Sequence, residues 1–328
     1  MTGDECLFSL TDIWQARRRL QPHILRTPLL LSHSLSQLTG CQIYLKMECW
    51  QLCGCFKVRG AINMVASLSN RERRSGLVTC SSGNHGVALS FAARLFGQTP
   101  TKVFVPENAE RTKTKKISLF GAEVVYYGND FLNTLEYATN YAKEHAAVFV
   151  HSHSHPLVIA GQGTIGLEII EDLPDVEVVI VPVGGGGLIA GIVTALKSAR
   201  KRIQVIGVEP SAAPGAYISF RDGYCHEKIP LRTSIADGLM GTLTPLTFAL
   251  TYRLVDEIAL VEDQEIIEAM RVFWEEEQLM IEGSAAVGLA AVLAGKLNIK
   301  KQKTVLVLTG RNINWDRYRL LLEHGHAS

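Results

Sequence analysis

A single lysine with apolar neighbours carries the clearest chemical signal in this sequence. Lys57 stands between Phe56 and Val58, with glycines three residues away on either side at Gly54 and Gly60. Burial among apolar groups penalises the charged form of an amine and so lowers its pKa. A neutral amine can attack a carbonyl carbon and form a Schiff base. The pattern therefore predicts a nucleophilic lysine; the alternative is an ordinary surface lysine near the start of a helix.

Four consecutive glycines supply a second signal. Residues 184–187 separate a continuous apolar run from a helical pattern. Glycines leave the backbone N–H groups free to converge on one anion, and the dipole of the following helix adds partial positive charge. A tight turn would need fewer glycines. No lysine followed by serine or threonine stands in the spacing of a nucleoside-triphosphate loop. We therefore expect a phosphate site of another kind.

The same glycines allow a different interpretation. Residues 185–190 read Gly-x-Gly-x-x-Ala, and Glu209 stands at the end of the next expected strand. This arrangement fits the dinucleotide-binding pattern and would indicate an NAD-binding Rossmann oxidoreductase. The match is short, and it accounts neither for Lys57 nor for the loop at residues 81–86. We keep it as the alternative function.

A second strand-to-helix loop is rich in hydrogen-bond donors. Residues 81–86 read Ser-Ser-Gly-Asn-His-Gly. Their hydroxyls, their amide and the N–H groups at the following helix start suit an anion such as a carboxylate. A plain helix-capping loop would have the same composition.

A neutral hydroxyl completes the set, because Thr309 ends the last expected strand. A reactive lysine, a phosphate loop, a carboxylate loop and a hydroxyl are the groups that pyridoxal 5'-phosphate requires. The cofactor needs a lysine for its aldehyde, a phosphate site and a partner for its ring nitrogen. The sequence therefore predicts pyridoxal 5'-phosphate as the cofactor.

These residues must be positioned by alternating apolar runs and helical patterns, which predict an α/β fold with parallel sheets. Strands are expected at residues 43–47, 77–80, 102–105, 123–127, 148–151, 176–183, 204–208 and 304–308. Helices are expected at residues 10–20, 61–68, 87–96, 112–120, 131–145, 164–171, 188–201, 263–278 and 284–297. Lys57 falls in a loop. The three functional loops all follow strands, where ligands bind in such sheets.

The charge balance and the cysteines limit the class of protein. Lysine and arginine total 33 against 32 for aspartate and glutamate, so we expect neither a nucleic-acid nor a membrane surface. The N-terminal region lacks the apolar run of a signal peptide. Seven cysteines form no disulfide-like framework, and Cys53-x-Cys55 is not a zinc spacing. We expect a reduced, cytoplasmic protein.

Five motifs occur in order along nearly the whole chain. They lie at residues 55–61 (Cys-Phe-Lys-Val-Arg-Gly-Ala), 81–86, 159–164 (Ile-Ala-Gly-Gln-Gly-Thr), 182–188 and 235–238 (Ile-Ala-Asp-Gly). With them the chain resembles the threonine/serine dehydratase branch of the fold type II pyridoxal-phosphate enzymes, which includes serine racemase. Cys55 replaces the usual serine of the first motif. The ending at residues 309–314 is similar to that of dehydratases linked to hydroxyectoine utilisation.

The resemblance implies a fold and an assembly. The fold would be α/β and tryptophan synthase β-like, with two open twisted sheets and helices on both faces. Residues 1–75 and 154–328 would form a large domain that binds the cofactor. Residues 76–153 would form a small domain, and the protein would be a homodimer.

The resemblance also implies the site. Lys57 and Ser82 would be catalytic residues, Asn84 would bond the phenolic oxygen of the cofactor, and Thr309 would face its pyridine nitrogen. The cofactor-binding residues would be Phe56, Lys57, Asn84, Gly184, Gly185, Gly186, Gly187, Leu188, Gly238, Glu282 and Thr309. The substrate-binding residues would be Ser81, Ser82, Asn84, His85 and His153.

Two departures from the racemase pattern bear on function. The divalent-metal site of the racemase uses a glutamate, a backbone carbonyl and an aspartate. Glu209 and the carbonyl of Ala213 correspond to the first two, but Gly215 stands where the aspartate is expected. We therefore expect no metal. His153 replaces an asparagine that faces the substrate in the racemase, so we expect a different substrate preference.

The implied function is that of an ammonia-lyase, which converts a β-hydroxy amino acid into a 2-oxo acid and ammonia by α,β-elimination. Lys57 would remove the Cα proton. Serine racemisation through Ser82 is the alternative; a hydroxyl is a poor base unless a partner such as His85 supports it, so we expect elimination to dominate. Serine, threonine, 3-hydroxyaspartate, phenylserine and an acid derived from hydroxyectoine remain open as substrates. A non-catalytic amino-acid sensor would not need Lys57.

Overall fold

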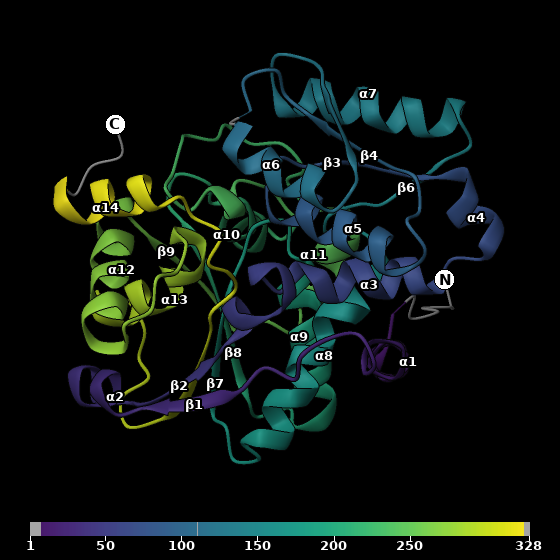
Figure 1. Cartoon of the computed structure of the whole chain (residues 1–328). Helices are drawn as coiled ribbons and strands as arrows, with labels where there is room; N and C mark the ends of the chain where they lie inside the picture. The colour runs from purple at the N-terminus through teal and green to yellow at the C-terminus, as the bar shows by residue number, and fades with distance from the viewer. Residues whose placement is uncertain (1–7, 110, 325–328) are drawn as a thin grey trace.

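The computed structural model describes residues 8–109 and 111–324, which form two sheets flanked by helices (Figure 1). The six-stranded sheet has the order β1-β2-β10-β7-β8-β9, and only β1 and β2 are antiparallel. Its strands are β1 (Leu29–Ser32), β2 (Gln42–Lys46), β7 (Val178–Pro182), β8 (Gln204–Pro210), β9 (Glu257–Val261) and β10 (Lys303–Val307). The arrangement confirms the α/β fold expected from the sequence.

The four-stranded sheet is parallel throughout, with the order β5-β4-β3-β6. Its strands are β3 (Leu77–Cys80), β4 (Thr101–Val105), β5 (Glu123–Tyr126) and β6 (Val148–Phe149). Helix α7 (Phe131–Glu144) packs on one face, while α5 (Asn84–Leu95) and α6 (Arg111–Leu119) pack on the other. Figure 1 shows this sheet at the top of the molecule, beneath α7.

Helices cover both faces of the six-stranded sheet as well. On one face, α12 (Asp263–Glu277) and α13 (Gly283–Leu293) form a core with β2, β7 and β8. On the other face, α8 (Pro156–Asp172) and α9 (Gly187–Ala199) form a second core with β7 and β10. Apart from α3, the other α-helices in the described residues are α1 (Leu10–Leu20), α2 (His33–Thr39), α4 (Asn70–Ser75), α10 (Gly215–Asp222), α11 (Pro245–Thr251) and α14 (Trp315–His324).

Helix α3 (Lys57–Ser67) connects the two parts of the molecule. Its apolar side, which includes Val58 and Ile62, shares one core with Ala88 of α5 and Val158 of α8. Figure 1 shows α3 between the four-stranded sheet and α8. The first residue of this helix therefore faces the boundary between the two sheets.

The structure corrects two expectations about helices. Lys57 begins α3 rather than lying in a loop, because the chain turns earlier, where Cys53 and Gly54 have φ angles of 64° and 73°. Helix α8 begins eight residues before the expected start at residue 164, with Pro156 in its first turn. Glycines weakened the helical pattern here. They are present because a Cβ on Gly161 would lie 2.6 Å from a backbone oxygen of α3.

The two edge strands of the six-stranded sheet, β1 and β9, were not among the expected strands. The domain boundaries at residues 75/76 and 153/154 stay a prediction. No helix among the described residues combines the length and the apolar character needed to cross a membrane.

Candidate active site

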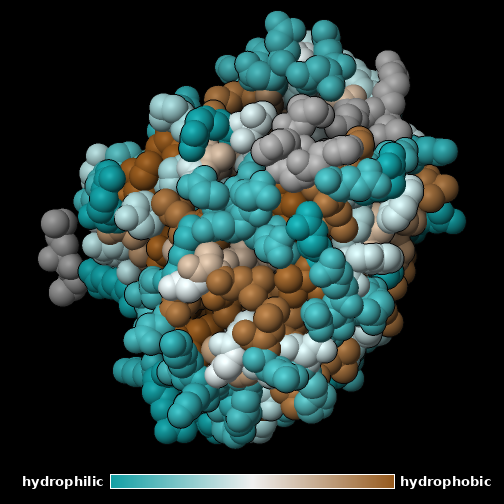
Figure 2. Space-filling view, turned by 90° about the vertical axis from the view of Figure 1, so that its left-hand side faces the viewer, coloured by the Kyte–Doolittle hydropathy of each residue, from teal (hydrophilic) through white to brown (hydrophobic). Residues whose placement is uncertain are grey.

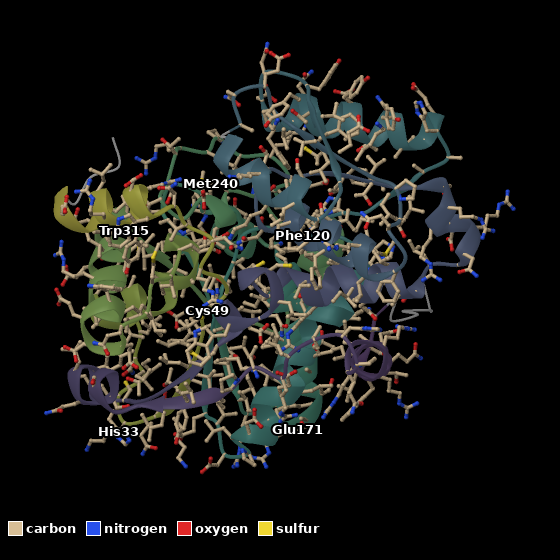
Figure 3. The ribbon with its side chains drawn as sticks, viewed as in Figure 1. His33, Cys49, Phe120, Glu171, Met240 and Trp315 are labelled. Carbon is tan, nitrogen blue, oxygen red and sulfur yellow. The ribbon has the colours of Figure 1, made fainter. Side chains whose placement is uncertain are left out.

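A cavity of about 600 Å³ opens between the two sheets. The loops that follow β3, β7 and β10 all contribute to its lining, as does the start of α3. Because parallel strands present their carboxyl ends at one edge, loops far apart in sequence converge there. Met240, labelled in Figure 3, lines the cavity from the loop that precedes α11.

The cavity brings together every residue that the sequence singled out for the cofactor or the substrate. The lining includes Phe56, Lys57, Ser81, Ser82, Asn84, His85, His153, Gly184, Gly185, Gly186, Gly187, Leu188, Gly238, Glu282 and Thr309. Their individual roles stay predictions.

The amine of Lys57 lies in this cavity and has one hydrogen-bond partner among the described residues. Its Nζ donates to the backbone oxygen of Ser152 at 3.1 Å and lies 5.1 Å from the centre of the Phe56 ring. Burial lowers the pKa of Lys57 to about 8, against a weaker opposing effect of nearby Cys55 and Glu282. An amine with this pKa has a substantial neutral fraction near neutral pH, as a nucleophile or a general base requires.

The glycine loop forms an open cradle at the N-terminus of α9. Gly186 caps that helix with a φ of 82°, which favours glycine. Gly185 is needed for space instead, because a Cβ there would lie 2.4 Å from ring atoms of His153. A Cβ on Gly187 would lie 2.7 Å from the backbone oxygen of His153. Backbone N–H groups at a helix start, with no side chains before them, fit a phosphate group.

This geometry places His153 beside the glycine loop. Its Nδ1 shares a hydrogen bond of 2.9 Å with the hydroxyl of Ser152, the residue whose carbonyl contacts Lys57. Burial, together with the nearby His151 and Lys57, holds the pKa of His153 well below its usual range. The imidazole is therefore neutral near neutral pH.

The loop at residues 81–86 leads directly into α5. The hydroxyl of Ser81 accepts from the N–H of Gly83 at 3.3 Å, and Asn84 is the first helical residue. His85 is buried and its Nε2 lies 3.1 Å from the backbone oxygen of Val150. Burial lowers its pKa to about 3. His85 is thus a neutral imidazole. Its Nε2 is bonded to the backbone oxygen of Val150 and not to Ser82.

Asn84 belongs to a polar cluster that also contains Glu282 and Asn312. The Nδ2 of Asn84 donates to Oε1 of Glu282 at 2.7 Å, and the Nδ2 of Asn312 donates to Oδ1 of Asn84 at 2.7 Å. Thr309 is buried nearby, and its carbonyl accepts from the N–H of Phe56 at 3.0 Å. The sequence analysis missed Asn312, although it stands in the same strand-end segment as Thr309.

A second unexpected feature lies beneath Lys57. Arg59 is fully buried and donates to both carboxylate oxygens of Glu48, at 2.8 Å each, and to both of Glu168, at 2.7 and 2.9 Å. Lys46 donates to Glu168 at 2.6 Å, and Thr27 donates to Glu48 at 2.5 Å. The sequence signal that could have revealed this network is the presence of charged residues within apolar patterns. The network fixes α3 to β2 and α8.

Glu209 is used structurally. Its two carboxylate oxygens accept from the N–H groups of Ala216 and Tyr217 at 2.9 Å, so it caps α10, which begins at Gly215. Burial raises the pKa of Glu209 to about 8, against the opposing effect of these two hydrogen bonds. Because both oxygens are buried and already bonded, Glu209 does not face a ribose as the dinucleotide interpretation requires. Among the described residues, no group of three or more His, Cys, Asp and Glu could hold a metal ion.

Lys57, the glycine loop, the residue 81–86 loop and Thr309 line one cavity, and such groups fit the aldehyde, phosphate and ring of pyridoxal phosphate. The family model described as pyridoxal-phosphate dependent enzyme matches residues 20–310, and the chain belongs to this family.

Similar proteins specify the branch. The chain is 43% identical over 320 residues to an L-threonine ammonia-lyase from Thermotoga maritima, covering 97% of this chain and 79% of that protein. It is 40% identical to the catabolic L-threonine dehydratase of Escherichia coli K12, covering 94% of each. These relatives confirm that the chain is a pyridoxal-phosphate-dependent ammonia-lyase of the dehydratase branch.

Solved structures agree on the fold. A serine racemase from maize has a TM-score of 0.90 and 32% identity, covering 97% of this chain and 99% of that chain. The processed form of a threonine deaminase from Solanum lycopersicum has a TM-score of 0.89 and 30% identity, covering 98% of this chain and 89% of that chain. The fold is thus the expected fold type II, and the dinucleotide-binding interpretation is set aside. Overall shape alone does not separate deaminase from racemase.

Proposed function

We propose that the enzyme acts on L-threonine, and more slowly on L-serine, and releases a 2-oxo acid and ammonia by α,β-elimination. The single observation that carries the proposal is the position of Lys57, whose low-pKa amine lies in one cavity with a donor-rich loop and a glycine cradle. Both curated relatives described above are named for threonine. Apolar Phe131 and Met240 are among the residues that line the same cavity.

The cofactor would supply the electron-withdrawing group for the reaction, and residues of the chain would position the cofactor and the substrate. When bound, pyridoxal phosphate supplies an electron-withdrawing aldehyde that acidifies Cα of an amino acid. Residues 184–187 with Leu188 would hold its phosphate, and Phe56 and Gly238 would flank the ring. The loop at residues 81–86 would hold the substrate carboxylate, so that Cα faces the Lys57 amine. Lys57 then takes the Cα proton as the general base.

The environment of Ser82 supports elimination over racemisation. Inverting Cα needs an acid–base group on the face opposite Lys57, for which Ser82 is the candidate. A hydroxyl needs a base partner. The Nε2 of His85 donates to the backbone oxygen of Val150, which leaves Nδ1 as the basic nitrogen, and Nδ1 has no hydrogen-bond partner among the described residues, Ser82 included. We therefore expect pyruvate to form faster than D-serine from L-serine. If D-serine forms faster, and Ser82→Ala removes only that activity, the enzyme is a racemase.

The cofactor assignment has its own test. Purified protein should carry a visible absorbance band that borohydride bleaches, and peptide mapping should find the reduced cofactor on Lys57. Ammonia release should then be measured across threonine, serine, 3-hydroxyaspartate and phenylserine. A preference for 3-hydroxyaspartate would contradict the proposed action on threonine.

We further propose a cytoplasmic homodimer. The cysteines that the structure describes are free, as a reducing compartment allows. Trp50, Leu279 and Met280 line a second hollow of about 430 Å³, and Figure 2 shows apolar residues gathered at the centre of one face. Surfaces of this kind mark protein contacts. Sedimentation at micromolar concentration should give a dimer mass; a monomer would refute this part.

A further inference from the structure

We propose that Asn312 is a positioning residue that holds the side-chain amide of Asn84 with its NH₂ group directed toward the cofactor site. The inference rests on the proposed role of Asn84 as the partner of the cofactor's phenolic oxygen. An amide can point either way, and only its hydrogen-bond partners decide which end donates. Here those partners form a chain in which each direction is fixed.

The orientation of Asn312 follows from two partners of opposite kind. Its Nδ2 lies 2.8 Å from the backbone oxygen of Cys53, and a carbonyl oxygen can only accept. Its Oδ1 lies 2.8 Å from Nζ of Lys116, and an ammonium group can only donate. The amide of Asn312 can therefore lie in one orientation only.

The orientation of Asn84 follows from that of Asn312. The second hydrogen of the Asn312 Nδ2 is donated to Oδ1 of Asn84 at 2.7 Å. The Nδ2 of Asn84 then donates to Oε1 of Glu282 at 2.7 Å, while Oε2 of Glu282 accepts from the backbone N–H of Asn312 at 3.1 Å. The ring is closed, and Asn84 retains one further N–H for an acceptor in the cavity.

Glycines keep the space that this ring needs. A Cβ on Gly310 would lie 2.4 Å from Oε1 of Glu282, and a Cβ on Gly54 would lie 3.0 Å from Oδ1 of Asn312. The ring also joins separate parts of the molecule, since Lys116 lies on α6, Asn84 begins α5 and Asn312 follows β10. The NH₂ direction at Asn84 thus depends on contacts between the two sheets.

The chemical consequence concerns the phenol of the cofactor. A donor facing a phenolic oxygen stabilises its ionised form, whereas an acceptor favours the neutral phenol. Asn312→Asp replaces the Nδ2 donor with an acceptor that faces Oδ1 of Asn84. The new carboxylate and Glu282 then both require a donor from the Asn84 amide, which carries its NH₂ group on one side only. Either orientation leaves two acceptors facing each other, so the single orientation of the wild-type amide is lost. Asn312 lines the cavity as well, and in this account its effect on the phenol is carried by the orientation of Asn84.

The experiment is a pH titration of the visible absorbance of the cofactor-loaded protein. Asn312→Asp should transfer intensity from the band of the ionised phenol to that of the neutral phenol and raise the titration midpoint by about one pH unit. Asn84→Asp should give a similar shift, and the double variant should add little to it. Asn312→Ala removes the Nδ2 donor without putting an acceptor in its place, and it should shift the midpoint in the same direction. This variant provides the test if Asn312→Asp does not fold.

The matched control is Asn314→Asp. Asn314 lines the same cavity, but its Oδ1 accepts from the N–H of Asp316 at 2.8 Å, and an aspartate preserves that bond. The control adds the same charge and should leave the band in place. An equal shift in the control, or no shift in Asn312→Asp, overturns the inference. A wild-type protein with no cofactor band would instead overturn the proposed function.

Discussion

The buried network under the active-site helix makes a strong prediction about stability. Arg59→Met puts a long apolar side chain in place of the arginine and removes the cation that faces two carboxylates. Arg59 and Glu48 are both fully buried, and Glu168 is nearly so. The network holds two cations and two carboxylates, and the substitution leaves one negative charge in the interior uncompensated.

The expected loss in the free energy of unfolding is about 3–5 kcal/mol, which is typical when one partner of a buried ion pair is removed. A surface cation near the end of α8 provides the matched control. Arg26→Met removes the ion pairs with Glu171 and Asp172 of that helix. Glu171 is labelled in Figure 3, and the Arg26 side chain is 46% exposed. That loss should not exceed about 1 kcal/mol.

The pH dependence of the loss has a definite sign. Burial alone would raise the pKa of Glu168, but the charges of Arg59 and Lys46 and their hydrogen bonds lower it below its ordinary value of 4.5. Stability from this group is present above pH 4.5 and is lost as the pH falls through the lowered pKa. The deficit of Arg59→Met should therefore be largest near neutral pH and shrink in acid.

The assay is urea unfolding of the cofactor-loaded protein, followed by fluorescence and by loss of the cofactor band. Adding Glu48→Gln to Arg59→Met removes the surplus charge and should recover part of the loss. If Arg59→Met costs no more than Arg26→Met, or if its deficit grows in acid, the reasoning about the network is wrong.

Other predictions follow from the site. Gly185→Ala places a Cβ 2.4 Å from the His153 ring, so the loop must shift and cofactor affinity should fall about tenfold or more. The same clash should lower the free energy of unfolding by about 1–3 kcal/mol, and unchanged affinity would place the phosphate elsewhere. The rate at which the cofactor-free protein captures pyridoxal phosphate should rise with pH with a midpoint near pH 8, because burial lowers the pKa of Lys57 to about 8. A midpoint near 10.5 would contradict that environment. Magnesium or calcium should leave the melting temperature unchanged, because Glu209 already accepts hydrogen bonds from two N–H groups and Gly215 supplies no carboxylate. A saturable rise in the melting temperature that a chelator reverses would refute this.

The sequence was sufficient for the parts of the site that depend on local pattern. An apolar run followed by a polar or glycine-rich stretch predicts the end of a strand. This pattern was enough to predict that the residue 81–86 loop, the glycine loop and Thr309 lie at strand ends. The parallel sheets then brought those ends together. Lys57 was identified from its neighbours, although its place at the first position of α3 depends on the turn made by Cys53 and Gly54.

The parts that could not be predicted depend on packing between distant segments. Arg59 has the same local neighbours whether it is exposed or buried, and only the fold brings Glu168 to it across 109 residues of chain. The direction of the Asn84 amide depends on Asn312, which lies 228 residues away. The close contact of His153 with Gly185 has a similar origin, because it joins a linker to a strand-end loop.

The central claim is that this chain is a pyridoxal-phosphate-dependent ammonia-lyase in which Lys57 is the base. The most direct test compares ammonia and 2-oxobutanoate release from L-threonine by the wild-type protein and by Lys57→Ala, both supplied with excess cofactor. We predict equimolar release of the two products by the wild type and a loss of at least about a thousandfold in the variant, as expected when a base and nucleophile is removed. Comparable turnover by Lys57→Ala, or no 2-oxobutanoate from the wild type, would contradict the account.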